Sequence, residues 1–161
     1  MGKSIARERV DSLTQLLKAY RARLTYHPRK RHLFLSFHAG DRKQVDGFRL
    51  MSLNQRVALE FYDASVRVPI NSERATYVRR VIRNKISRAE VLVCLIGNGT
   101  AWREWVDWEI AEAKALRKGV CGVRLKGSRG RIPPGLSGSP ICPWDMDCII
   151  AAIECAAARR N

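Results

Sequence analysis

Residues 90–100 read EVLVCLIGNGT, and this stretch decides the fold of the chain. Its first part, residues 90–96, is apolar almost throughout, which is typical of a central strand buried on both faces of a parallel sheet. A Gly-Asn-Gly turn ends the strand, and the segment 101–118 that follows has the periodicity of a helix. We predict that Thr100 is the N-cap of this helix and that Gly119 supplies its C-terminal stop.

Strand and helix patterns alternate on both sides of this stretch. Further strands are predicted at residues 32–37, 57–62 and 120–125 and near Ile141, and further helices at 44–56, 73–87 and 144–158. The alternation implies a parallel sheet covered by helices on both faces. We therefore predict an α/β fold, a flavodoxin-like three-layer sandwich with a parallel sheet of about five strands. If the strand order is 2-1-3-4-5, ligands bind at the carboxyl ends of the first and third strands.

The N-terminal part of the chain is predicted to be an appendage, residues 1–31, ahead of a domain formed by residues 32–161. Apolar residues recur at spacings of three and four along 4–25, as in an amphipathic helix: Val10, Leu13, Leu17, Tyr20 and Leu24. Residues 1–31 contain nine Lys or Arg and two acids. We expect this basic helix and linker to pack on the domain or on a partner subunit.

Composition indicates a globular chain, because 46% of the 161 residues are hydrophobic and 28% are charged. No stretch approaches the ~20 apolar residues that span a bilayer, and the basic N-terminus is not followed by an apolar block. We therefore expect a cytoplasmic protein without membrane contact. The net charge of +15 favours anionic partners: nucleic acid, a phosphate-bearing small molecule or an acidic protein. Any nucleic-acid binding should be weak, non-specific and steeply reduced by salt.

The cysteine pattern predicts neither a disulfide framework nor a metal site. The five cysteines are odd in number and form no C-x-x-C pair. Cys94 and Cys121 lie inside apolar runs, where buried and unreactive thiols are expected.

The start of the helix at 101–118 could provide a catalytic acid. Three of the four tryptophans of the chain lie within WREWVDWEI, residues 102–110. Trp102, Trp105 and Glu109 are spaced i, i+3 and i+7, so they are predicted to project from one side of the helix. A carboxylate flanked by indoles is partly desolvated and can stabilise a developing cation. On the helix alone we favour another interpretation, a packing helix with Glu109 in a surface ion pair.

Three segments, in this order along the chain, favour the catalytic interpretation of Glu109: HLFLSFHAGDR at 32–42, EFYDAS at 60–65 and EVLVCLIGNGTAWREWVDWEI at 90–110. Together they resemble the motifs of TIR-like domains, most closely those of the bacterial branch found in Thoeris antiphage defence. The resemblance covers about residues 32–126. Trp105 and Glu109 match the family's W-x-x-x-E motif, whose glutamate is catalytic in the NAD-cleaving members. The sequence departs from the family at Val106, where a cysteine is common, and the loop at 63–69 lacks the Pro-Gly of receptor-type members.

The resemblance implies an NAD nucleohydrolase or cyclic ADP-ribose-type synthase with Glu109 as the catalytic residue. Such an enzyme releases nicotinamide through an oxocarbenium-like transition state and makes an ADP-ribose-derived, cyclic signalling nucleotide in antiphage immunity. NAD is then the substrate, and no cofactor is needed. The resemblance also implies self-association on activation and a downstream effector that the diffusible nucleotide reaches. The predicted substrate-binding residues are Ser36, Phe37, His38, Arg42, Tyr62, Asp63, Asn98 and Trp105. Each of three of these residues also has a structural interpretation: Phe37 as a core residue, His38 as a solvated loop residue and Asp63 as a turn residue.

The main alternative is a TIR-like interaction module without enzymatic activity, which binds nucleic acid or a protein partner through its basic surface. The net charge and the Arg29-Lys30-Arg31 run favour this hypothesis. No interleaving of aromatic and basic residues resembles a single-strand binding platform. A phosphoryl-receiver domain is disfavoured because the third strand ends in Ile96-Gly97-Asn98 without an Asp. The chain also lacks the G-x-G-x-x-G of a dinucleotide fold and a P-loop.

Overall fold

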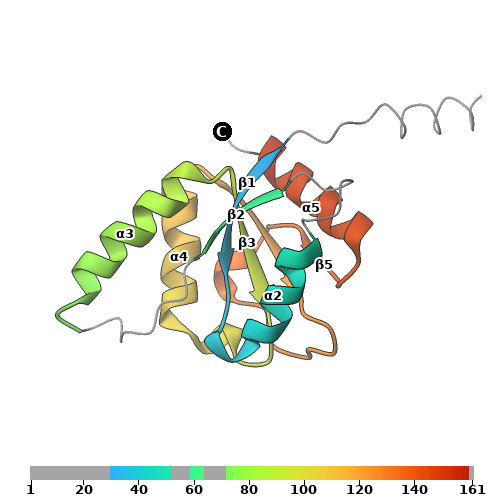
Figure 1. Ribbon diagram of the computed structural model, residues 1–161, viewed down its shortest axis with the longest axis horizontal. Helices are drawn as coiled ribbons and strands as arrows, with labels where there is room; N and C mark the ends of the chain where they lie inside the picture. Colours follow the sequence, from blue (N-terminus) through green and yellow to red (C-terminus); the bar gives the residue numbers. More distant parts are fainter. Residues whose placement is uncertain (1–29, 52–58, 64–71, 160–161) are drawn as a thin grey trace, which may run out of the picture.

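The computed structural model describes residues 30–51, 59–63 and 72–159 (Figure 1). Its sheet consists of β1 (Arg31–Ser36), β2 (Leu59–Asp63), β3 (Val91–Ile96), β4 (Gly119–Arg124) and β5 (Ile141–Cys142). The strand order is β2-β1-β3-β4-β5, and every neighbouring pair is parallel. The structure therefore confirms the predicted flavodoxin-like sheet, and its strand order is the one that the predicted ligand position assumes. The predicted N-terminal helix at 4–25 lies outside the described residues.

Helices cover both faces of the sheet and complete the three layers (Figure 1). These are α2 (Arg42–Met51), α3 (Ala75–Arg88), α4 (Glu104–Ala115) and α5 (Met146–Ala158), with short 3₁₀ turns η1 (Ala39–Asp41), η2 (Thr100–Trp102) and η3 (Pro134–Leu136). Helices α2 and α5 pack on one face, and α3 and α4 pack on the other. None of the helices in the described part of the chain is long and apolar enough to cross a membrane.

The hydrophobic core explains the continuous apolar run of β3. Successive side chains of a strand point to opposite faces of the sheet. Leu92, Cys94 and Ile96 belong to the core under α3 and α4, whereas Val91, Val93 and Leu95 belong to the core under α2 and α5. All six side chains are inaccessible to solvent. Burial on both faces is the reason that β3 does not alternate apolar and polar residues.

The helix predicted over 101–118 is interrupted near its start, which corrects two predictions. Thr100 is not the N-cap of α4, because its Oγ1 accepts a hydrogen bond from the backbone N of Gly97 and donates one to the carbonyl of Leu95. These bonds hold the turn after β3, and Arg103 is extended, so α4 begins only at Glu104. Trp102 lies outside α4 and is 70% exposed. The predicted alignment of Trp102 with Glu109 along one helix is therefore wrong.

The C-terminal stop of α4 was also predicted at the wrong residue. The left-handed residue after the helix is Arg117, with φ of 54°, while Gly119 already belongs to β4. A Cβ on Gly119 would lie 2.4 Å from the carbonyl oxygen of Ala156. Gly119 is therefore required by the close approach of α5 to β4 and not by a turn.

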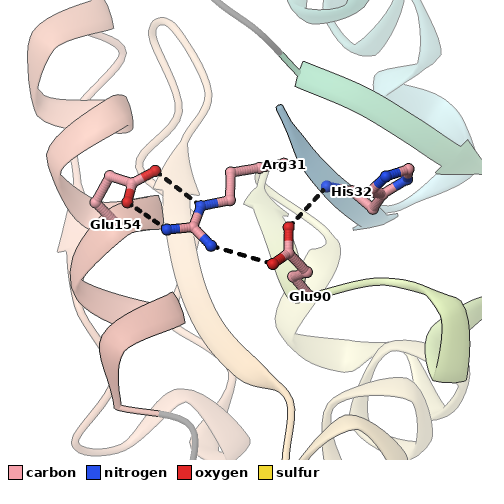
Figure 2. A network of polar contacts seen from close by, with 4 residues as sticks. All are labelled: Arg31, His32, Glu90 and Glu154. Atoms are coloured by element: carbon pink, nitrogen blue, oxygen red, sulfur yellow. Dashed lines mark hydrogen bonds and ion pairs between the residues drawn. The ribbon is translucent and has the colours of Figure 1, made fainter. Parts of the chain in front are cut away.

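An ion-pair network ties three elements together at the amino-terminal edge of the sheet (Figure 2). The Arg31 guanidinium donates Nε to Glu154 Oε1 at 3.0 Å and Nη2 to Glu154 Oε2 at 2.7 Å, a bidentate contact with α5. Its Nη1 donates to Glu90 Oε1 at 3.1 Å, and the backbone N of His32 donates to Glu90 Oε2. Hydrogen bonding to Glu154 raises the pKa of Arg31, and burial opposes that rise. The network joins the start of β1 to α5 and to the residue before β3.

The five cysteines are free thiols in different environments. Cys94, Cys121 and Cys142 are buried, Cys155 is half-buried and Cys148 is exposed. Burial raises the pKa of the Cys94 and Cys121 thiols, and it raises the pKa of Cys142 to about 11. Buried thiols with raised pKa values react slowly, because the thiolate is the reactive species.

We expect a disulfide reagent to modify Cys148 rapidly and Cys155 more slowly in the native protein, and all five cysteines after unfolding. The raised pKa values of Cys94, Cys121 and Cys142 also predict that the fold becomes less stable at alkaline pH. These neutral thiols make their full contribution to stability below about pH 8.5, the pKa of a thiol in the unfolded chain. The contribution is lost as the pH rises through the pKa values of the folded protein. Urea unfolding between pH 8 and 10 should therefore show a falling midpoint. Rapid modification of three or more native thiols would contradict this description of the core.

Candidate functional site

The carboxyl ends of β1 and β3 form the point where the strand order reverses. The chain passes from β1 to β2 on one side of the sheet and from β3 to β4 on the other. In open α/β sheets this switch point is the usual place for a ligand. Ser36, the last residue of β1, pairs in register with Cys94 of β3. Chemistry in this fold is therefore expected beside Ser36 and the end of β3.

Helix α4 brings Glu109 to this switch point. The Oγ of Ser36 donates a hydrogen bond to Oε2 of Glu109 at 2.5 Å, although 73 residues separate the two in sequence. Glu109 is 3% exposed and Ser36 is completely buried. Burial is the main cause of the raised pKa of Cys94, and the charge of Glu109 is the next. The carboxylate thus lies against both strands, in an environment where charges interact strongly.

Trp105 is the tryptophan that accompanies Glu109, one turn earlier on α4. It is half-buried and packs edge-to-face on Trp108, with ring centroids 5.6 Å apart. The exposed Trp102 instead lies under the guanidinium of Arg131, 5.7 Å from its ring centroid. Glu109 therefore lies beside the buried residues Ser36 and Cys94 of the sheet. Trp105 packs on the core under α3 and α4, and Trp102 lies outside α4.

Two residues that follow β1 occupy different environments. Phe37 is 8% exposed and belongs to the core under α2 and α5, the face of the sheet opposite α4. His38 is half-buried, and its Nδ1 accepts a hydrogen bond from the backbone N of Gly40 at 3.2 Å, which caps η1. Its ring also lies near Gly99, since a Cβ there would be 3.7 Å from Nδ1. The structure thus places His38, but not Phe37, at the carboxyl edge beside the turn after β3.

Asn98 forms hydrogen bonds with the loop that follows β4, beside the site. Its Oδ1 accepts hydrogen bonds from the backbone N of Arg129 at 3.0 Å and from Ser128 Oγ at 3.3 Å. Gly130 packs so closely on this turn that a Cβ would lie 1.9 Å from the carbonyl oxygen of Gly97. The side-chain oxygen of Asn98 is therefore engaged in holding the loop after β4.

The remaining predicted contacts lie at the same edge of the sheet. Arg42 is exposed at the first position of α2. Tyr62 and Asp63 end β2, in register with Phe34 and Leu35 of β1, and their side chains lie outside the described part of the structure. The structure therefore brings Ser36 and Glu109 into contact, with Trp105 one helical turn away.

Asp41 is a residue at this edge that the sequence analysis did not single out. Its carboxylate packs directly on Gly97, where a Cβ would lie 2.0 Å from Oδ2. That oxygen is buried and has no hydrogen-bond partner among the described residues. A buried acceptor without a partner is uncommon and can accept a hydrogen bond from a bound molecule. Asp41 lies in the quoted segment HLFLSFHAGDR, but no sequence pattern shows that its carboxylate is buried against Gly97.

The candidate site lies within the part of the chain that matches a known family. Residues 34–130 match the family model of the Thoeris protein ThsB, TIR-like domain. The matched range begins within β1, ends in the loop after β4, and includes Ser36, Trp105 and Glu109. A search of curated proteins gave no significant match.

Proposed function

Because the chain belongs to the TIR-like domain family of the Thoeris protein ThsB, and is thus a defence-related TIR-like module, we propose that it cleaves NAD. The proposed products are nicotinamide and an ADP-ribose-derived, cyclic signalling nucleotide that reaches a downstream effector in antiphage immunity. The observation on which the proposal rests is the buried carboxylate of Glu109, hydrogen-bonded to Ser36 where the strand order reverses.

The proposed reaction breaks the bond between the nicotinamide nitrogen and the anomeric carbon of the ribose. The bonding electron pair leaves with nicotinamide, which becomes neutral, and positive charge develops on the ribose. The carboxylate of Glu109 stabilises this charge, and its burial strengthens the attraction. Water then attacks and releases a proton to solvent to give ADP-ribose, or a nucleophile within the ADP-ribosyl group attacks to give a cyclic isomer. Nicotinamide is already cationic in NAD, so its departure requires no general acid.

We base the roles of the other residues at the carboxyl edge of the sheet on their positions. Ser36 is proposed as a positioning residue, because its hydroxyl fixes one oxygen of Glu109. Asp41 is proposed to accept a hydrogen bond from a ribose hydroxyl through its buried oxygen. His38 and Arg42 are proposed to contact the polar parts of NAD. Tyr62 and Asp63 are proposed to flank the bound NAD from the end of β2, whereas the burial of Phe37 and the loop contacts of Asn98 favour structural roles.

Access to Glu109 requires a change in the arrangement described here. The carboxylate is 3% exposed, so a ribose can approach it only when neighbouring side chains move. We propose that self-association on activation accompanies this opening. The test is to express the full chain in bacteria, with and without phage infection, and to measure nicotinamide and NAD in extracts. Nicotinamide release on infection supports the proposal. Unchanged nicotinamide and NAD in infected cells would favour the non-enzymatic interaction module.

Ser36→Ala should lower kcat for nicotinamide release by about 10-fold or more while changing KM little, because the lost hydrogen bond orients a group that acts in the transition state. Ser36→Thr, which keeps a hydroxyl, should recover part of the rate. The measurement is the initial rate of nicotinamide release over a range of NAD concentrations, with melting temperatures recorded for each variant. A rise in KM at constant kcat would indicate that Ser36 contacts substrate instead.

A further inference from the structure

A basic hollow lies at the amino-terminal edge of the sheet, at the opposite end of the strands from Ser36 and Glu109. The end of α4, the start of β4, the turn at 137–140 and the end of α5 line this hollow, whose volume is about 230 Å³. The lining includes the polar side chains of Lys114, Lys118, Ser137, Ser139 and Arg159. Neither the family match nor the proposed NAD reaction assigns a role to these side chains.

All the charged side chains that line the hollow, among the described residues, are cationic. Lys114, Lys118 and Arg159 face it, and none of the described residues that line it is acidic. The Nζ of Lys118 donates to the carbonyl oxygen of Ser87 at 2.7 Å, and Nη1 of Arg159 donates to the carbonyl oxygen of Gly138 at 3.3 Å. These bonds to backbone carbonyls hold the two cationic side chains in place beside the hollow. A recess lined by charges of one sign attracts small ions of the opposite sign.

The turn at 137–140 adds neutral donors to these cations. Ser137 and Ser139 flank Gly138, whose φ of 75° allows the chain to reverse at the mouth of the hollow. Hydroxyl, ammonium and guanidinium groups together are the donors that bind phosphate oxygens in proteins. The volume is below the ~300–1,000 Å³ typical of sites for drug-sized molecules, so it suits a compact anionic group.

We propose that this hollow binds the phosphate or diphosphate group of a small molecule, as a second site separate from that of Glu109. The proposal does not rest on NAD cleavage, because the two regions lie at opposite ends of the parallel strands. It also gives a specific location to the anionic partner that the net charge of +15 favours.

Calorimetric titration of the full chain with inorganic pyrophosphate at constant ionic strength tests the proposal. Lys114→Gln and Arg159→Gln should each raise the Kd for pyrophosphate by about 10-fold or more, as expected for loss of a charge-assisted hydrogen bond. The matched control is Arg117→Gln, which removes the same charge from an exposed position that does not line the hollow. The control should change the Kd by less than about 3-fold, since screening weakens charges outside the site. Glu109→Gln should bind pyrophosphate as the natural chain does.

Three results would overturn the proposal. The first is absence of binding by the natural chain, which would leave the cations the structural role of stabilising two helix C-termini. The second is equal weakening by Arg117→Gln and Lys114→Gln, which would indicate general electrostatic attraction. The third is a single-stranded oligonucleotide that displaces pyrophosphate equally well from the natural chain and from Lys114→Gln, which would indicate a nucleic-acid surface. Lys114 is exposed on the last turn of α4, so its variant should fold even if Arg159→Gln does not.

Discussion

Replacing Glu109 with Gln is expected to lower the rate of nicotinamide release from NAD by about 10²–10³-fold, which is the usual effect of removing one preorganised electrostatic group. The amide keeps the size of the carboxylate and can still accept the hydrogen bond from Ser36, so folding should be nearly unchanged. Only the charge that would stabilise the positively charged ribose is lost. The measurement is nicotinamide release by activated protein, together with a thermal melt of the same sample.

The control for this variant comes from the same helix. Glu104 is exposed in the first turn of α4, and Glu104→Gln should release nicotinamide at the rate of the natural chain. Glu112 is unsuitable as a control, because its buried carboxylate accepts a hydrogen bond from Nε of Arg83 and joins α4 to α3. Full activity of Glu109→Gln with an intact fold would show that the reaction takes place elsewhere or that the acid is not required.

Local sequence patterns were sufficient to predict the sheet. The apolar run at 90–96 and the alternation of strand and helix patterns reflect which side chains are buried. Burial can be predicted from sequence, because it determines the composition and the spacing of apolar residues. The same reasoning predicted the short strand at Ile141, whereas the strand order entered only as the usual order of a flavodoxin-like sheet. Trp105 and Glu109 were correctly placed on one helix, because their spacing of four residues needs no information from the rest of the chain.

The errors and omissions arose where particular side-chain hydrogen bonds and tertiary contacts determine local structure. The break before α4 depends on the hydroxyl of Thr100 bonding back to Leu95, and a sequence pattern cannot distinguish this bond from an N-cap. The contact of Asn98 with the loop after β4 joins residues about 30 positions apart. The contact of Ser36 with Glu109 spans 73 positions, and the packing of Asp41 on Gly97 also requires the folded sheet. Site residues were predicted individually, and their hydrogen bonds were not.

The largest effect on stability is expected from Arg31, whose contacts with Glu154 span 123 positions (Figure 2). Its side chain is 14% exposed and that of Glu90 is 13% exposed, so Arg31→Met leaves a partly buried carboxylate without its cation. We expect the free energy of unfolding to fall by about 2–4 kcal/mol, somewhat less than for a fully buried pair, because the side chain of Glu154 is 35% exposed. For a chain of this size the melting temperature should fall by roughly 5–15 °C.

The neighbouring residue Lys30 provides the matched control for this loss. Its ion pair with Glu60 is exposed, with 64% and 42% of the two side chains accessible, so Lys30→Met should leave the melting temperature nearly unchanged. Arg31→Lys should be intermediate, because an ammonium keeps the charge but not the bidentate geometry. Equal melting temperatures for Arg31→Met and Lys30→Met would show that the network does not stabilise the fold. Because Arg31 lies at the edge of the sheet opposite Glu109, the folded Arg31→Met protein should release nicotinamide at the natural rate. Glu109→Gln should show the reverse: normal stability with a rate lowered by about 10²–10³-fold.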